Sequence, residues 1–146
     1  MKGQQINLFQ VFRSERGQSL TEMAFATVVL LILLGGVVDL GRAFFTYMAL
    51  RDSVQEGALY GSIHPNQTVE IKNHVLSASS MMQDILASDD ITVTVIGAAC
   101  SGNSIRVRAL YPDFPLTMPF LGAIVGSQTV AISATVTDTI LSPSCP

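Results

Sequence analysis

The sequence contains no tryptophan, few charged residues, and only two histidines and two cysteines. Charged residues make up 13% of the 146 residues and hydrophobic residues 49%, whereas soluble domains have roughly 25% charged residues. A membrane-spanning segment would explain part of this deficit. His64 and His74 lack the spacing of metal ligands, and no CxxC pair or Cys/His cluster occurs. We therefore expect solvated histidines and no metal or other cofactor.

Sequence motifs for catalysis and for phosphate binding are also missing. The sequence has no G-x-S-x-G or H-E-x-x-H motif, and its glycines match no phosphate-binding loop. Asp89 and Asp90 are adjacent acids at an expected helix–strand junction, where they fit a cap or turn, with a calcium site as the alternative. We expect no catalytic residues and no enzyme, because a small tethered enzyme would need a reactive cluster.

The formal net charge is −3, but the charges are unevenly distributed. Residues 1–17 are basic overall, and the remaining residues are acidic overall. The charged residues of the basic stretch are Lys2, Arg13, Glu15 and Arg16. An acidic body argues against binding to nucleic acid. The positive-inside rule predicts a single-pass protein of the cytoplasmic (inner) membrane, with its N-terminus in the cytoplasm and an extracytoplasmic head.

An uncharged run extends from Met23 to Val38. Its 16 residues correspond to about 24 Å of helix, whereas a bilayer core requires about 20 residues. Residues 18–40 reach that length but include an acid near each end, Glu22 and Asp39. We expect residues 18–40 to form the membrane-spanning half of a longer helix.

The second half of this helix is expected to pack on a head domain, residues 41–146. Apolar and small residues recur there at spacings of four and three, which is the pattern of one buried helix face. They are Ala43, Tyr47, Leu50, Val54, Ala58 and Gly61. Gly61 and Pro65 are stop signals, so the whole helix is predicted to run from Gln18 to Ser62.

A second helix is expected after Pro65, with Asn66 or Thr68 as its cap and its end near residues 87–90. Its apolar residues have the same helical spacing and are Ile71, Val75, Ala78, Met82 and Ile85. Three later segments alternate between apolar and polar residues, which is typical of strands with one buried face. They are residues 91–95, 105–109 and 130–136, with a turn at 101–103 between the first two. The alternation favours antiparallel pairing.

The stretch from Tyr111 to Leu121 contains three prolines and three aromatic residues. Because proline does not fit a central strand, we expect a long loop that covers the sheet or contacts a neighbouring subunit. Together the segments predict an α+β fold, in which a long N-terminal helix and a second helix pack on an antiparallel sheet of about three strands.

The two cysteines, Cys100 and Cys145, lie in the part that is expected to be exported, where disulfides form. A bridge between them would tie the C-terminal segment back to the head. The alternative is a pair of free thiols in a reducing compartment.

The most informative segment is RSERGQSLTE, residues 13–22, directly before the apolar run. A carboxyl group is costly in hydrocarbon and is rarely found there without a role. The arrangement resembles the class III signal of type IV pilins and pseudopilins, in which a prepilin peptidase cuts after the glycine. Residues 1–17 would then be a leader, cut between Gly17 and Gln18, and Glu22 would be the fifth mature residue. The alternative for Glu22 is an acid favoured by the helix dipole.

From Arg16 to Gly61 the sequence resembles the TadE-like family of minor pilins, or pseudopilins, of tight-adherence secretion systems. The matching features are the glycine–glutamate start, the apolar run, an acid-x-Gly-Arg element, an aromatic-rich turn and a small-residue tail. The acid-x-Gly-Arg element consists of Asp39, Leu40, Gly41 and Arg42. Asp39 and Arg42 either pair on the helix or act as solvated interfacial anchors. The chain differs from the much shorter major pilins, which carry Glu-Tyr where this sequence has Glu-Met.

The resemblance implies a role and a set of partners. Gly17 would fit the narrow pocket of the peptidase, and the new amine of Gln18 would pair with Glu22 of the same or a neighbouring subunit. The implied partners are the prepilin peptidase, other pilin and minor pilin subunits, the inner-membrane assembly platform and membrane lipid. The expected product is a minor pilin that primes or joins a tight-adherence pilus or secretion pseudopilus. The alternative is an uncleaved membrane anchor that displays an extracytoplasmic binding domain.

Overall fold

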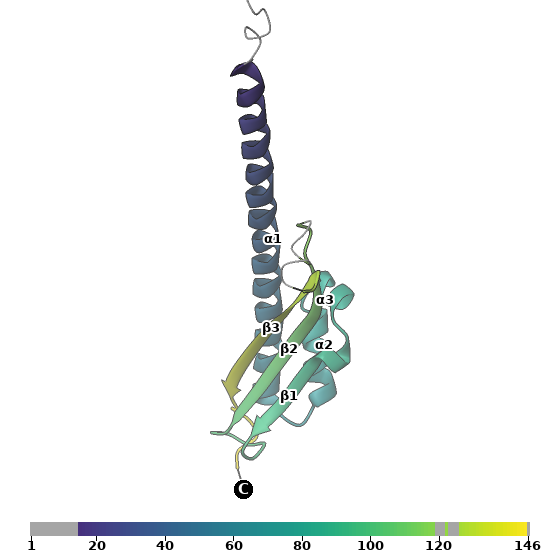
Figure 1. Ribbon diagram of the computed structural model, residues 1–146. Helices are drawn as coiled ribbons and strands as arrows, with labels where there is room; N and C mark the ends of the chain where they lie inside the picture. Colours follow the sequence, from purple (N-terminus) through teal and green to yellow (C-terminus); the bar gives the residue numbers. More distant parts are fainter. Residues whose placement is uncertain (1–14, 119–121, 123–125, 146) are drawn as a thin grey trace, which may run out of the picture. The chain divides into compact units, whose positions relative to one another are not determined.

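The computed structural model describes residues 15–118, 122 and 126–145 (Figure 1). Most of the expected leader, residues 1–14, lies outside this range. The chain divides into two compact units, Met1–Val37 and Val38–Pro146, and we call the second unit the head. Among the described residues, three α-helices precede three strands, which confirms the α+β fold predicted from the sequence.

Helix α1 extends from Glu15 to Ile63, in agreement with the long helix predicted for residues 18–62. Its apolar side chains before the head are exposed, including Leu20, Phe25 and Leu30. By length and composition, α1 is the one helix among the described residues that is able to cross a membrane. Its C-terminal end is closed by a hydrogen bond from the N–H of His64 to the carbonyl of Tyr60.

The head buries one face of α1. Leu50, Val54 and Ala58 are fully buried, as the spacing predicts. Tyr47 was expected on this face but is 40% exposed, and Thr46 is buried instead. Both positions lie one turn before Leu50, and the face that contacts the head is rotated toward the smaller side chain.

The second predicted helix is two helices, α2 (Thr68–Ser77) and α3 (Ser80–Ile85). Ser79 separates them in an extended conformation, and its hydroxyl accepts a hydrogen bond from the N–H of Met82. A serine that caps a new helix ends the previous one, although the apolar spacing continues across the break. The predicted caps of α2 were also wrong, because the N-cap is Gln67 and its side chain forms no cap bond.

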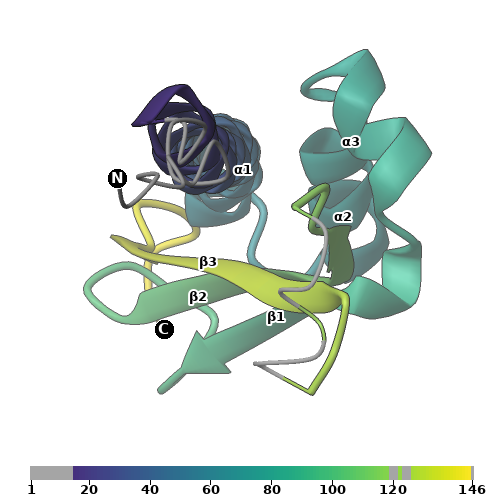
Figure 2. The ribbon, with the colours of Figure 1, turned by 45° about the horizontal axis from the view of Figure 1, so that its top comes forward.

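Strands β1 (Ile91–Ile96), β2 (Ser104–Pro115) and β3 (Thr129–Thr139) form an antiparallel sheet in the order β1-β2-β3. Val107 pairs with Val93 on one side and with Val136 on the other. Figure 2 shows α2, α3 and the head's part of α1 on one side of this sheet. The core between the helices and the sheet includes Leu50, Ile71 and Ile105, all fully buried.

Strand β2 continues through part of the stretch that was predicted to be a loop. Pro112 and Asp113 lie in a register shift, where two residues of β2 stand opposite Ala131 of β3. Strand β1 pairs with β2 only up to Ala109, so the prolines interrupt no hydrogen bonds on that side. A bulge at an edge is where proline is tolerated in a sheet, and the loop prediction for residues 111–115 was therefore wrong.

Two smaller features also differ from, or refine, the expectations. The expected solvated histidines, His64 and His74, both stack on the ring of Tyr60, with centroid distances of 4.7 and 4.1 Å. Asp90 closes a short 3-10 turn, Ser88–Asp90, by accepting a hydrogen bond from the N–H of Ala87 at 2.8 Å. The acidic pair thus contributes a cap at the helix–strand junction.

Candidate functional site

The residues of the predicted cleavage signal lie in the first turns of α1. Gly17, Gln18 and Glu22 are exposed, and the side-chain amide of Gln18 donates to the carboxylate of Glu22 at 3.2 Å. A Cβ atom added at Gly17 would meet no atom of the described residues within 4 Å, apart from its own helical turns. The packing of the described part of the chain therefore does not require glycine at this position, although glycine weakens a helix by about 1 kcal/mol relative to alanine.

In the head, the carboxylate of Asp39 binds a loop that is distant in the sequence. Asp39 is only 4% exposed, and it accepts hydrogen bonds from the backbone N–H groups of Thr117 at 3.0 Å and Met118 at 2.7 Å. The hydroxyl of Thr117 also donates to this carboxylate. We call Asp39, Arg42, Thr117 and Met118 the Asp39 clamp. Since a buried carboxylate without partners is strongly unfavourable, these donors are what allow the charge to be buried.

Arg42 completes the clamp from the next turn of α1. Its guanidinium lies 3.3 Å from the Asp39 carboxylate and donates to the hydroxyl of Thr117 at 2.6 Å. The same guanidinium stands 5.3 Å from the ring centroid of Phe114, a cation–π contact. The sequence left two alternatives for the acid-x-Gly-Arg element, a pair on the helix or two solvated anchors. The structure contains the pair of Asp39 and Arg42. Gly41 contributes no side chain to it, and a Cβ there would meet no atom of the described residues within 4 Å, apart from its own helical turns.

The loop that Asp39 holds has most of its described backbone groups paired within the head. The N–H of Leu116 donates to the carbonyl of Gln128 at 2.9 Å. The side-chain amide of Gln128 donates in return to the carbonyls of Leu116 and Met118, at 3.0 and 3.1 Å. With the two N–H groups bound by Asp39, residues 116–118 depend on water for very little of their hydrogen bonding.

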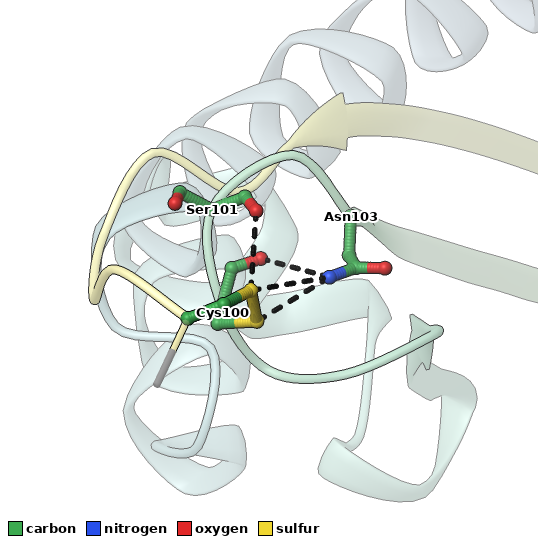
Figure 3. The surroundings of a disulfide bond; sticks show 4 residues. Cys100, Ser101 and Asn103 are labelled. Atoms are coloured by element: carbon green, nitrogen blue, oxygen red, sulfur yellow. Dashed lines mark hydrogen bonds between the residues drawn. A yellow bond between two sulfur atoms is a disulfide. The ribbon is translucent and has the colours of Figure 1, made fainter.

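Cys100 and Cys145 are joined by a disulfide, with their Cα atoms 5.0 Å apart. Figure 3 shows the side-chain amide of Asn103 directed at the bridge, and this amide donates to the carbonyl of Cys100 at 3.2 Å. The segment before Cys145 returns to the end of α1, where the N–H of Leu141 donates to the carbonyl of Ser62 at 2.8 Å. The bridge and this bond together fix the C-terminal segment to the head.

A family model described as TadE-like protein matches residues 17–59. This segment is TadE-like. The match confirms, for this segment, the resemblance inferred from the sequence. It begins at Gly17 and includes Glu22, Asp39 and Arg42. Comparison with curated proteins gave no match, and comparison with solved structures gave none.

Sequence reasoning found the helix residues of the TadE-like segment but not their partners in the loop. Thr117, Met118 and Gln128 carry no recognisable motif, and the carboxylate binds backbone N–H groups that any residue type supplies. A sequence feature that could have drawn attention to this loop is the lack of any charged residue from Phe114 to Thr137. Within the described residues, no group of three or more potential metal ligands occurs. What the described arrangement provides is the attachment of a loop to a helix.

Proposed function

We propose that the chain is a TadE-like minor pilin, or pseudopilin, that a prepilin peptidase cleaves between Gly17 and Gln18. The mature chain would prime or join a tight-adherence pilus or a secretion pseudopilus. The observation that carries this proposal is the position of Gly17 and Glu22. They open a TadE-like segment and stand on the exposed surface of an apolar helix.

The structure around Gly17 supports the view that a binding partner, and not the packing of this chain, requires glycine there. Among the described residues outside its own helical turns, no atom lies within 4 Å of a Cβ built at residue 17, so this part of the chain gives no packing reason for glycine. A peptidase whose pocket beside the cleaved bond is too narrow for a side chain would require glycine at this position. The glycine also lowers the cost of unwinding the helix locally, which a protease needs in order to reach the peptide bond.

Glu22 supports the second part of the proposal, which is assembly. It is the single charged residue between Arg16 and Asp39, and its carboxylate already contacts the side chain of Gln18. After cleavage, the α-amine of Gln18 would be a cation one helical turn away or in the adjacent subunit. Pairing would offset the cost of placing both charges in an apolar filament core.

The proposal gives the chain a structural role in the inner membrane and no enzymatic one. Its α1 helix would anchor it in a single pass before assembly, with the head outside the cytoplasm. The partners would be the peptidase, other pilin subunits and the assembly platform. Activity of the purified head as an enzyme would contradict this assignment.

The test is the intact mass of the chain recovered from membranes of cells that process other prepilins. We expect a chain that begins at Gln18, with or without a methyl group, and the full-length mass for Gly17→Leu. Gly41→Leu is the matched control, because residue 41 also has open space around it on the same helix. We expect Glu22→Ala to be cleaved but absent from sheared filaments. An uncleaved native chain would instead favour an anchored extracytoplasmic binding domain.

A further inference from the structure

We propose that the bilayer interface covers residues 40–45 of α1 together with residues 116–118 of the loop held by Asp39. The membrane boundary would then lie between Phe45 and Arg51, instead of at residue 40 as the sequence suggests. This inference rests on the membrane anchoring in the proposed function. It assigns to the head a lipid-facing surface that is built by the Asp39 clamp.

The first argument concerns the length of the apolar run. The run ends at Asp39 only if that carboxylate faces solvent, but Asp39 is 4% exposed and its charge is paired. Arg42 is bound to the same carboxylate, and the next charged residues are Arg51 and Asp52, both exposed. From Met23 to Leu50 the helix has 28 residues, about 42 Å, which is enough for a hydrocarbon core of about 30 Å and an interface.

The second argument is the surface that follows Asp39 on α1. Leu40, Phe44 and Phe45 are 73%, 59% and 76% exposed within the head. Residues 40 and 44 are one turn apart, and residue 45 is rotated by about 100° from residue 44, so the three form a broad apolar stripe that covers more than one row of α1. An exposed apolar surface of this kind that continues a membrane-spanning run is more stable when lipid covers it than when water does. Beyond the stripe, the exposed surface of α1 again carries charged side chains, at Arg51, Asp52 and Glu56.

The third argument is the chemistry of the loop. No charged residue occurs from Phe114 to Thr137, whereas the sheet has exposed arginines at positions 106 and 108. In a medium without water, backbone polar groups need partners within the protein. Asp39 and Gln128 supply such partners to the N–H groups of residues 116–118 and to the carbonyls of Leu116 and Met118. The clamp therefore prepares a non-helical segment for a low-dielectric environment.

Arg42 is compatible with this depth. Its side chain remains 44% exposed while it binds Asp39 and Thr117. A long cationic side chain of this kind is able to keep its charge near lipid phosphates. Lipid is favoured over a second copy of the chain as the occupant, because the stripe continues an apolar run in the sequence of the same helix and the loop beside it is also uncharged.

The test uses the full chain in vesicles of phosphatidylcholine and phosphatidylglycerol, with phosphatidylcholine brominated on its acyl chains as the quencher. An environment-sensitive dye is attached to one added cysteine, at Leu30→Cys, Phe45→Cys or Leu59→Cys, with the native disulfide intact. Leu59 is the matched control, since it is an exposed apolar residue of α1 (58%) that lies beyond the charged positions. We expect fluorescence to be lost at residues 30 and 45 and kept at residue 59.

Quenching at residue 30 without quenching at residue 45 would overturn this inference and leave membrane anchoring in place. No quenching at residue 30 would overturn both. Equal quenching at residues 45 and 59 would indicate general adsorption of the head and would also reject the inference. Protection of residue 45 from an aqueous quencher, without quenching by bromine and lost on dilution of the protein in lipid, would identify a second copy as the occupant.

Discussion

The carboxylate of Asp39 accepts a hydrogen bond at 3.0 Å from the backbone N–H of Thr117, a residue 78 positions further along the chain. This contact joins the first turn of α1 in the head to the segment that follows β2. It gives the acid of the acid-x-Gly-Arg element a role within the chain itself. The pairing with Arg42 and the binding of the loop are therefore parts of the same arrangement.

We predict that Asp39→Asn lowers the stability of the head by about 2–3 kcal/mol, because an amide replaces a charged acceptor of several hydrogen bonds. The measurement is hydrogen exchange of β2 and β3 in the full chain in detergent. Asp52→Asn, an exposed change on the same helix, should leave these rates unchanged. Equal protection in both variants would mean that the clamp contributes little.

We predict that replacing both cysteines, Cys100→Ser with Cys145→Ser, lowers stability by about 3–4 kcal/mol, since the bridge closes a long loop. The two cysteines are 45 positions apart. The measurement is the urea midpoint of the head in detergent, and chemically reduced native protein serves as the control. A midpoint equal to that of the oxidised protein would show that the hydrogen bonds of the C-terminal segment are sufficient.

We predict that Gly57→Ala destabilises the head by about 1–3 kcal/mol, although alanine favours a helix. A Cβ at residue 57 would overlap the side chain of Val75 and lie 3.2 Å from the carbonyl of Ile71. Gly41→Ala is the matched control, because its Cβ meets nothing within 4 Å and the change should be neutral or stabilising. Thermal unfolding of the two variants distinguishes close packing from helix propensity, and similar melting temperatures would contradict the packing explanation.

The sequence predicted those parts of the fold that periodicity determines. The buried face at Leu50, Val54 and Ala58 and the three alternating strands follow from spacings of about 3.6 and 2, and the structure has them. Periodicity did not predict the break at Ser79, since a cap is a local hydrogen bond that leaves the apolar spacing unchanged. Periodicity also did not predict that Pro112 lies in strand β2. Proline is tolerated there because β1 does not pair with that part of β2.

The candidate site, like the fold, was predictable from the sequence only in part. The acid and arginine of the clamp stand out in sequence because charges are rare in an apolar helix. Their partners, the N–H groups of Thr117 and Met118, are backbone atoms and have no sequence signature. Long-range binding of a side chain to backbone becomes visible only when the fold brings the two segments together.

The disulfide has one further consequence, for the integrity of the head after damage. The bridge between Cys100 and Cys145 encloses β2, the loop held by Asp39 and β3. A single cut in the backbone between these cysteines leaves both pieces covalently attached. A protease that nicks the loop at the end of β2 would therefore release no fragment, and β3 would remain linked to the head that it completes.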